Sequence, residues 1–64
     1  MFLPAKEILP TMKVLLNFQT HTVINIELHY NCVKLITYVK NQHRHEVFDL
    51  PKDVYLKIQH NPYA

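Results

Sequence analysis

The fold class of this chain depends on residues 31–42, which read NCVKLITYVKNQ. Asn31 is typical of the start of a helix, because its short side chain can accept a hydrogen bond from a backbone N–H two or three positions later. The apolar residues that follow have the i, i+3, i+4, i+7 spacing of one helical face, and they are Cys32, Leu35, Ile36 and Val39. We therefore predict a helix from Cys32 to about Gln42, with Tyr30 packing against its first turns.

Before this segment, two stretches have apolar side chains at every second position, which is the pattern of strands with one buried face. They are residues 13–18, with Val14, Leu16 and Phe18, and residues 22–28, with Ile24, Ile26 and Leu28. Because the chain between them contains no glycine, we expect a loop of roughly three to five residues rather than a two-residue type I′ turn. The two stretches together predict a β-hairpin.

After the predicted helix, residues 43–46 are expected to form a polar connection and residues 47–53 an irregular segment, because Pro51 keeps Leu50 out of the helical region. Residues 54–58 alternate again and predict a third strand. The predicted domain covers residues 12–60, and residues 61–64 form a tail. The predicted core consists of Val14, Leu16, Phe18, Ile24, Ile26, Leu28, Cys32, Leu35, Ile36, Val39, Leu50, Leu56 and Ile58.

Residues 1–11 are interpreted as an N-terminal extension, because Pro4 and Pro10 interrupt any regular pattern. Two alternatives remain open for this segment. Leu3, Ile8 and Leu9 can dock on the domain, or residues 5–9 can form one helical turn.

A hairpin, a helix and a further strand, in this order, resemble the first part of ubiquitin and its relatives. The resemblance rests on TVINIEL at 22–28, on Val33-Lys34-x-Ile36 in the helix, and on LPKD at 50–53 followed by Leu56 and Ile58. Asn31-Cys32 and Val39-Lys40 are also similar to a small family of uncharacterised vertebrate ubiquitin-like proteins. The resemblance covers about residues 12–58 and implies an α+β fold. This fold is a β-grasp-like ββαβ unit, an incomplete ubiquitin-like fold with an N-terminal extension.

Two departures from the ubiquitin pattern set the functional expectation. No sequence remains for the late strand that lies beside the first strand of ubiquitin, and this leaves an edge of residues 13–18 as a template for another chain. Three outcomes are open: residues 2–9 fold back onto this edge, a second chain adds a strand, or residues 54–58 pair with it directly. We favour direct or partial pairing with residues 54–58, with association by strand addition at residues 13–18 at high concentration. The chain has no Gly-Gly tail, so we expect no conjugation to other proteins. We therefore expect a non-catalytic ubiquitin-like interaction module that binds another protein through its sheet edge or face, or associates with itself by strand addition. The candidate partner-binding residues are Lys13, Leu15, Asn17, Tyr55 and Lys57.

Composition narrows the classes of function further. The chain has 64 residues, enough for one domain with a small core but not for a cofactor pocket beside a separate substrate site. It has no glycine for a phosphate-binding loop, and its single cysteine excludes an intrachain disulfide. The net charge of +2 gives no strong reason to expect nucleic acid or an anionic membrane as partner. We expect an intracellular protein, in the cytoplasm or nucleus, without enzymatic activity, cofactor or membrane contact.

The alternative is a small metal- or nucleic-acid-binding protein. His43 and His45 have the chemistry of metal ligands, and Glu46 and a residue such as His21, His29, His60 or Cys32 would complete a site. The nucleic-acid surface would consist of Lys13, Lys34, Lys40, Arg44, Lys52 and Lys57 with Tyr38 and Tyr55. We favour a polar loop for the histidines and a solvated face for the lysines. We also expect Cys32 to pack in the core rather than act as a nucleophile, and we predict no metal site.

Overall fold

Residues 32–39 form a strand, and this changes the fold class. In the computed structural model, which describes all of residues 1–64, β4 spans Cys32–Val39 and a short 3₁₀ turn, η2, follows at Lys40–Gln42. The buried side chains of β4 occur at every second position and are Val33, Leu35, Thr37 and Val39. The predicted helix from Cys32 to about Gln42 is therefore wrong. Most residues of β4 are β-branched or aromatic, which favours a strand over a helix.

Thr37 conceals the alternation of β4 in the sequence, because it is a polar residue that is completely buried. Its hydroxyl donates a hydrogen bond to the backbone carbonyl oxygen of Glu46 at 3.0 Å. This bond offsets the cost of burying a polar group, and it makes threonine acceptable at a core position.

Six strands form one sheet with the order β1-β6-β2-β3-β4-β5, and every neighbouring pair is antiparallel. The other strands are β1 at Phe2–Pro4, β2 at Lys13–Leu16, β3 at Gln19–Leu28, β5 at Arg44–Pro51 and β6 at Tyr55–His60, and a second 3₁₀ turn, η1, lies at Ala5–Glu7. The chain contains no α-helix, so the expected α+β class with its β-grasp-like, incomplete ubiquitin-like ββαβ fold is wrong. None of its helical turns has the length and hydropathy needed to cross a membrane.

The segment expected to connect the helix to the last strand is itself a strand. β5 includes most of the expected polar connection at 43–46 and most of the irregular segment at 47–53. His43 adopts a left-handed conformation, with φ of 49°, and allows the chain to reverse direction after η2. The strand predicted at 54–58 is confirmed as β6, which pairs with β2.

The predicted hairpin is confirmed as β2 and β3, but its turn is tighter than expected. Leu16 pairs with Gln19, so the turn consists of Asn17 and Phe18 alone. These two residues have φ angles of 51° and 63°, the left-handed conformation that a type I′ turn requires at both positions. The expectation of a loop of three to five residues was wrong because Phe18 occupies a position that usually requires glycine.

A β-bulge at Ile24 divides β3 into two halves. Val23 pairs with Thr37 and Asn25 pairs with Ile36, so Ile24 has no partner of its own on β4. A bulge bends its strand and moves the following side chains to the opposite alternation. His21 and Val23 therefore face the core before the bulge and Ile26 faces it after the bulge, whereas Ile24 is exposed although the sequence pattern grouped it with the core.

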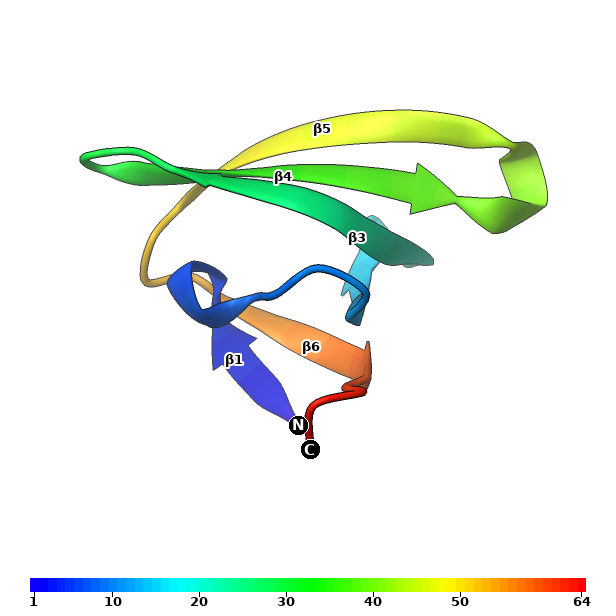
Figure 1. Cartoon of the computed structure of the whole chain (residues 1–64), viewed down its shortest axis with the longest axis horizontal. Coiled ribbons are helices and arrows are strands. Elements are labelled where there is room, and N and C mark those ends of the chain that lie inside the picture. The colour runs from blue at the N-terminus through cyan, green and yellow to red at the C-terminus, as the bar shows by residue number, and fades with distance from the viewer.

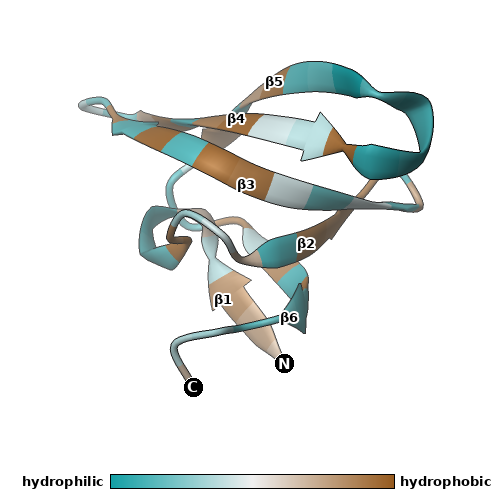
Figure 2. Ribbon diagram, turned by 45° about the vertical axis from the view of Figure 1, so that its right-hand side comes forward, coloured by the Kyte–Doolittle hydropathy of each residue, from teal (hydrophilic) through white to brown (hydrophobic).

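The bend folds the sheet into two layers that face each other (Figure 1). One layer contains the long strands β3, β4 and β5; the other contains β1 and β6 with β2, and residues 5–12 run between the layers. In Figure 2, hydrophobic and hydrophilic segments alternate along β3 and β4, as expected for strands with one buried face. The buried core cluster consists of Ala5, Ile8, Met12, Val14, Val23, Val33, Leu35, Leu56 and Ile58.

The core differs from the predicted one because of the bulge and because β4 is not a helix. Phe18, Ile24 and Leu28 are exposed, and Cys32 and Ile36 lie on the outer face of β4 with partial exposure. Tyr30, expected to pack on the helix, is 96% exposed at the β3–β4 turn. The buried apolar residues that the pattern did not predict are Ala5, Ile8, Met12, Val23 and Val33.

The N-terminal segment is attached to β6 and to the β5–β6 connection. β1 pairs with β6, and η1 is the single helical turn that was one of the two alternatives for this segment. The other alternative is confirmed for Leu3 and Ile8, which pack in the core, whereas Leu9 is exposed. The backbone N–H of Ala5 donates to the carbonyl oxygen of Val54 at 2.8 Å. The ammonium group of Lys6 donates to Asp53 at 3.0 Å, and this hydrogen bond raises the pKa of Lys6 above its usual value.

Candidate functional site

Four of the five predicted partner-binding residues lie on one face of the sheet. Leu15 pairs with Lys57 across β2 and β6, Tyr55 lies two positions before Lys57 on β6, and Lys13 pairs with His60. All four belong to the outer face, the side of the sheet turned away from the core, since they alternate with the buried Val14, Leu56 and Ile58. The fifth residue, Asn17, is exposed in the β2–β3 turn.

The outer face continues from β2 across the other strands. Lys13 pairs with Thr22, Thr22 pairs with Tyr38, and Tyr38 pairs with His45, so these residues form one row. The rings of Tyr38 and His45 are in contact, with centroids 5.0 Å apart. The row has a cation at one end and aromatic rings at the other, and contains no carboxylate. It can therefore offer a charge, hydroxyl groups and flat apolar contact to a ligand.

The β2–β3 turn presents an aromatic ring to solvent. Phe18 is 100% exposed, although its backbone is in a conformation that costs a residue with a Cβ roughly 1–2 kcal/mol. Phe18 therefore combines backbone strain with a large apolar side chain in water, and both are unfavourable to folding. Neither feature contributes to the stability of the fold.

A groove with a volume of about 410 Å³ lies beside Phe18, between the β2–β3 hairpin and η2. It is called the hairpin groove below. Its cations are Lys13 and Lys40, and its lining contains no acidic residue. The other polar residues that line it include Thr20, Thr22, Asn41 and Gln42. Arg44 lies next to it, because the Arg44 guanidinium donates to Gln19 Oε1 at 3.2 Å, while an ion pair with Glu46 neutralises it.

β5 forms the open edge of the sheet. It pairs with β4 on one side only, whereas β2, β3, β4 and β6 have neighbours on both sides. The other edge strand, β1, has three residues and ends in Pro4. β5 has eight residues, and its outer-face side chains are His45, Val47 and Asp49, with Val47 56% exposed. A strand of this length with unpaired backbone groups can accept a further strand.

The first predicted strand has no open edge. β2 pairs with β3 on one side and with β6 on the other. The direct pairing of the last predicted strand with residues 13–18, which was the favoured outcome, is therefore confirmed. The strand addition expected at this edge is wrong, because β6 occupies it.

His21 lies at the centre of a buried polar network. Its Nε2 donates to the carbonyl oxygen of Leu16 at 3.1 Å, since a carbonyl can only accept. Its Nδ1 lies 3.2 Å from Oγ1 of Thr37, and its ring contacts Phe48 edge-on with centroids 5.2 Å apart. The ring connects β2, β3, β4 and β5 and has no solvent-accessible surface, which assigns it a structural role.

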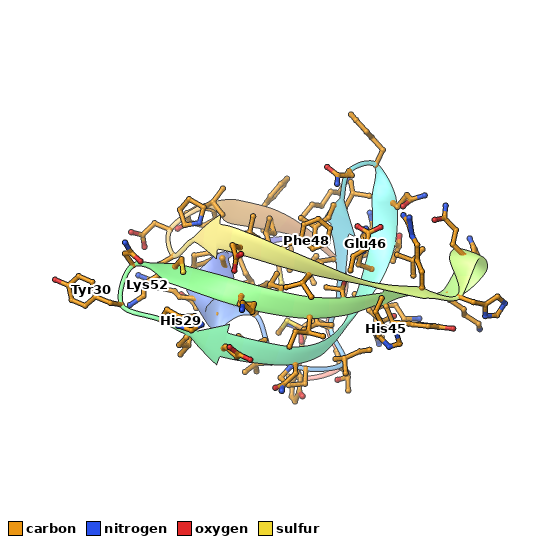
Figure 3. The ribbon with its side chains drawn as sticks, turned by 90° about the horizontal axis from the view of Figure 1, so that it is seen from above. His29, Tyr30, His45, Glu46, Phe48 and Lys52 are labelled. Atoms are coloured by element: carbon orange, nitrogen blue, oxygen red, sulfur yellow. The ribbon has the colours of Figure 1, made fainter.

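The remaining histidines and Cys32 do not gather into a metal site. His45 lies at the opposite end of the β3–β4–β5 layer from His29 and Tyr30 (Figure 3). His43 Nδ1 lies 3.2 Å from the hydroxyl oxygen of Tyr38. His29 Nε2 lies 3.3 Å from the carboxylate of Glu27. No group of three or more His, Cys, Asp or Glu side chains has the arrangement to hold a metal ion. The metal version of the alternative function therefore has no geometric support.

A comparison with protein-family models, with curated proteins and with solved structures found no match. We therefore infer function from the strand order, the exposed side chains and the hairpin groove of this chain.

Sequence reasoning missed both the exposed Phe18 and the edge at β5. A partial signal for β5 was present in the sequence, because the apolar Phe48 and Leu50 flank the polar Asp49. No comparable signal existed for Phe18, since its turn contains no glycine.

Proposed function

We propose that the chain is a non-catalytic protein-binding module that acts by strand addition at β5, and that its partner is a second copy of the same chain. The observation that carries the proposal is the edge position of β5. Strand addition satisfies unpaired backbone groups with main-chain hydrogen bonds, and the side chains of the edge then select the partner.

The side chains of β5 are complementary to themselves. In an antiparallel arrangement centred on Val47, this residue meets Val47 of the other copy, and His45 meets Asp49 of the other copy twice. All three residues project from the outer face, so the faces of the two sheets match. Favourable cross-strand pairs of this kind contribute about 0.2–1 kcal/mol each. This complementarity favours a second copy over an unrelated strand.

The proposal is tested by sedimentation velocity over a concentration series. Val47→Lys places two positive charges opposite each other at the centre of the pairing and is expected to abolish the dimer while the monomer stays folded, since Val47 is exposed. Leu28→Lys, at an exposed position on β3, is the matched control and is expected to leave the association unchanged.

Exchanging charges provides a second test. His45→Asp places carboxylates opposite Asp49 and is expected to weaken the dimer, whereas the double variant His45→Asp with Asp49→His restores the pairing. A wild-type chain that stays monomeric at all concentrations contradicts the proposal, and so does a dimer that tolerates Val47→Lys.

A further inference from the structure

The hairpin groove carries an inference that is independent of strand addition. We propose that it binds single-stranded nucleic acid, with a base stacked on Phe18 and the backbone phosphates held by Lys13 and Lys40.

Phe18 provides a surface for stacking. A fully exposed ring at the tip of a tight turn has one open face on which a planar group can stack. Stacking of a base on an aromatic side chain contributes to the binding of single strands by many proteins, and it requires a base that is not already stacked in a duplex. The tight turn fixes the backbone position of Phe18, because Asn17 and Phe18 are the only residues between the paired Leu16 and Gln19.

The hairpin groove is positively charged. Lys13 of β2 and Lys40 of η2 both line it, and no carboxylate does. The chain as a whole carries a net charge of only +2, so the composition does not reveal that two lysines lie close together at this groove. Two ammonium groups without a counter-charge favour an anionic ligand with at least two charges.

Polar side chains also line the groove. The hydroxyl groups of Thr20 and Thr22 and the amide groups of Asn41 and Gln42 provide hydrogen-bond donors and acceptors there. The edges of bases and the sugar hydroxyls make hydrogen bonds of this type. The volume of about 410 Å³ falls in the range of about 300–1,000 Å³ that small-ligand sites occupy. A single-stranded nucleic acid has all three features that this groove fits: flat bases, charged phosphates and hydrogen-bonding base edges. An acidic peptide has the charge but not a planar ring at every residue.

The experiment measures the fluorescence anisotropy of short end-labelled oligouridylate and oligothymidylate with the full chain. Phe18→Ala is expected to weaken binding about 5- to 150-fold, the range that corresponds to the loss of one stacked base. Tyr30→Ala is the matched control, because Tyr30 is equally exposed but lies at the β3–β4 turn, outside the groove; it is expected to leave the affinity unchanged.

The salt dependence of the affinity tests the role of the lysines. Two phosphate contacts on a single strand predict a slope of about −1.4 for log K against log salt, and Lys40→Ala is expected to reduce its magnitude by about 0.7. Lys34→Ala, on the outer face of β4 and outside the groove, is expected to leave the slope unchanged.

Several results overturn the proposal. Equal losses for Phe18→Ala and Tyr30→Ala mean that the ring does not bind a base. Binding of polyglutamate with the same affinity and the same salt slope means that the groove is an acidic-peptide site. A heteronuclear NMR titration that perturbs the amides of β6 but not those of Thr20 and Asn41 places the nucleic acid elsewhere.

Discussion

At the scale of single residues, Thr37 and His21 satisfy buried polar groups in the interior of the sheet. The Thr37 hydroxyl donates to the Glu46 carbonyl oxygen at 3.0 Å, and its oxygen lies 3.2 Å from His21 Nδ1. His21 Nε2 must carry a proton, because it donates to the carbonyl oxygen of Leu16.

We expect Thr37→Val to destabilise the fold by about 1–3 kcal/mol, because it leaves buried polar groups without a partner although the size of the side chain hardly changes. Chemical denaturation measures the loss, and long-range ¹H–¹⁵N spectra of the wild type report the Nε2–H tautomer of His21. A ring protonated only on Nδ1 contradicts the network described.

Phe18 illustrates a residue whose replacement improves the fold. Phe18→Gly removes the strain of a left-handed phenylalanine and creates the Asn-Gly pair that type I′ turns prefer. The greater entropy of glycine in the unfolded chain offsets part of this gain. We expect a net stabilisation of about 0.5–1 kcal/mol, visible as a melting temperature several degrees higher. Phe18→Ala keeps a Cβ and is expected to change the melting temperature much less.

At the scale of secondary-structure elements, the burial pattern of β4 distinguishes a strand, with a period of about 2, from a helix, with a period of about 3.6, at residues 32–39. Leu35 is completely buried and Ile36 lies on the outer face, although both belong to the predicted helical stripe. We expect Leu35→Ala to cost about 2–5 kcal/mol and Ile36→Ala clearly less, measured by chemical denaturation. Equal losses contradict the strand alternation, since on a helix the two neighbouring positions would share the buried face.

Part of this element pattern could be predicted from the sequence. The hairpin and the last strand follow from alternating apolar residues, and η1 was one of the alternatives for the N-terminus. β4 could not be predicted in this way because Leu35 and Val39 fit both a period of 2 and a period of 3.6, and because the polar Thr37 interrupts the apolar alternation in the sequence although it is buried. Tertiary pairing with β3 and β5 outweighed the helix-capping potential of Asn31.

The candidate site was predictable only in part. Lys13, Leu15, Lys57 and Tyr55 are near each other because β2 pairs with β6, a pairing that was the favoured one of three outcomes for residues 13–18. Lys40 and Phe18 meet in the hairpin groove because β3 and β4 are neighbours, which no local pattern indicates.

At the scale of the whole molecule, the N-terminal segment is a part of the core and not an appendage. Ile8 is nearly as buried as Leu35, and it lies between the two layers with Ala5 and Met12. We expect Ile8→Ala to destabilise the chain by about 2–5 kcal/mol, as much as Leu35→Ala, in the same denaturation series. Leu9→Ala is the matched control, because the neighbouring Leu9 is partly exposed and is expected to cost clearly less. A small effect of Ile8→Ala contradicts the placement of residues 5–12 between the layers.

The sheet order also has a consequence for the way the chain is made. β6, which follows the other five strands in the sequence, lies between β1 and β2, the two strands synthesised first. While residues 55–60 are still inside the ribosome, β1 has no strand to pair with and one edge of β2 stays open. Val14, Ile8 and the rest of the core therefore stay incompletely covered until β6 has left the exit tunnel. The sheet is completed by insertion of β6 between β1 and β2, and pairings this distant in sequence close slowly, in about milliseconds to seconds. During this interval the nascent chain presents an unpaired strand edge to which another chain or a chaperone can bind.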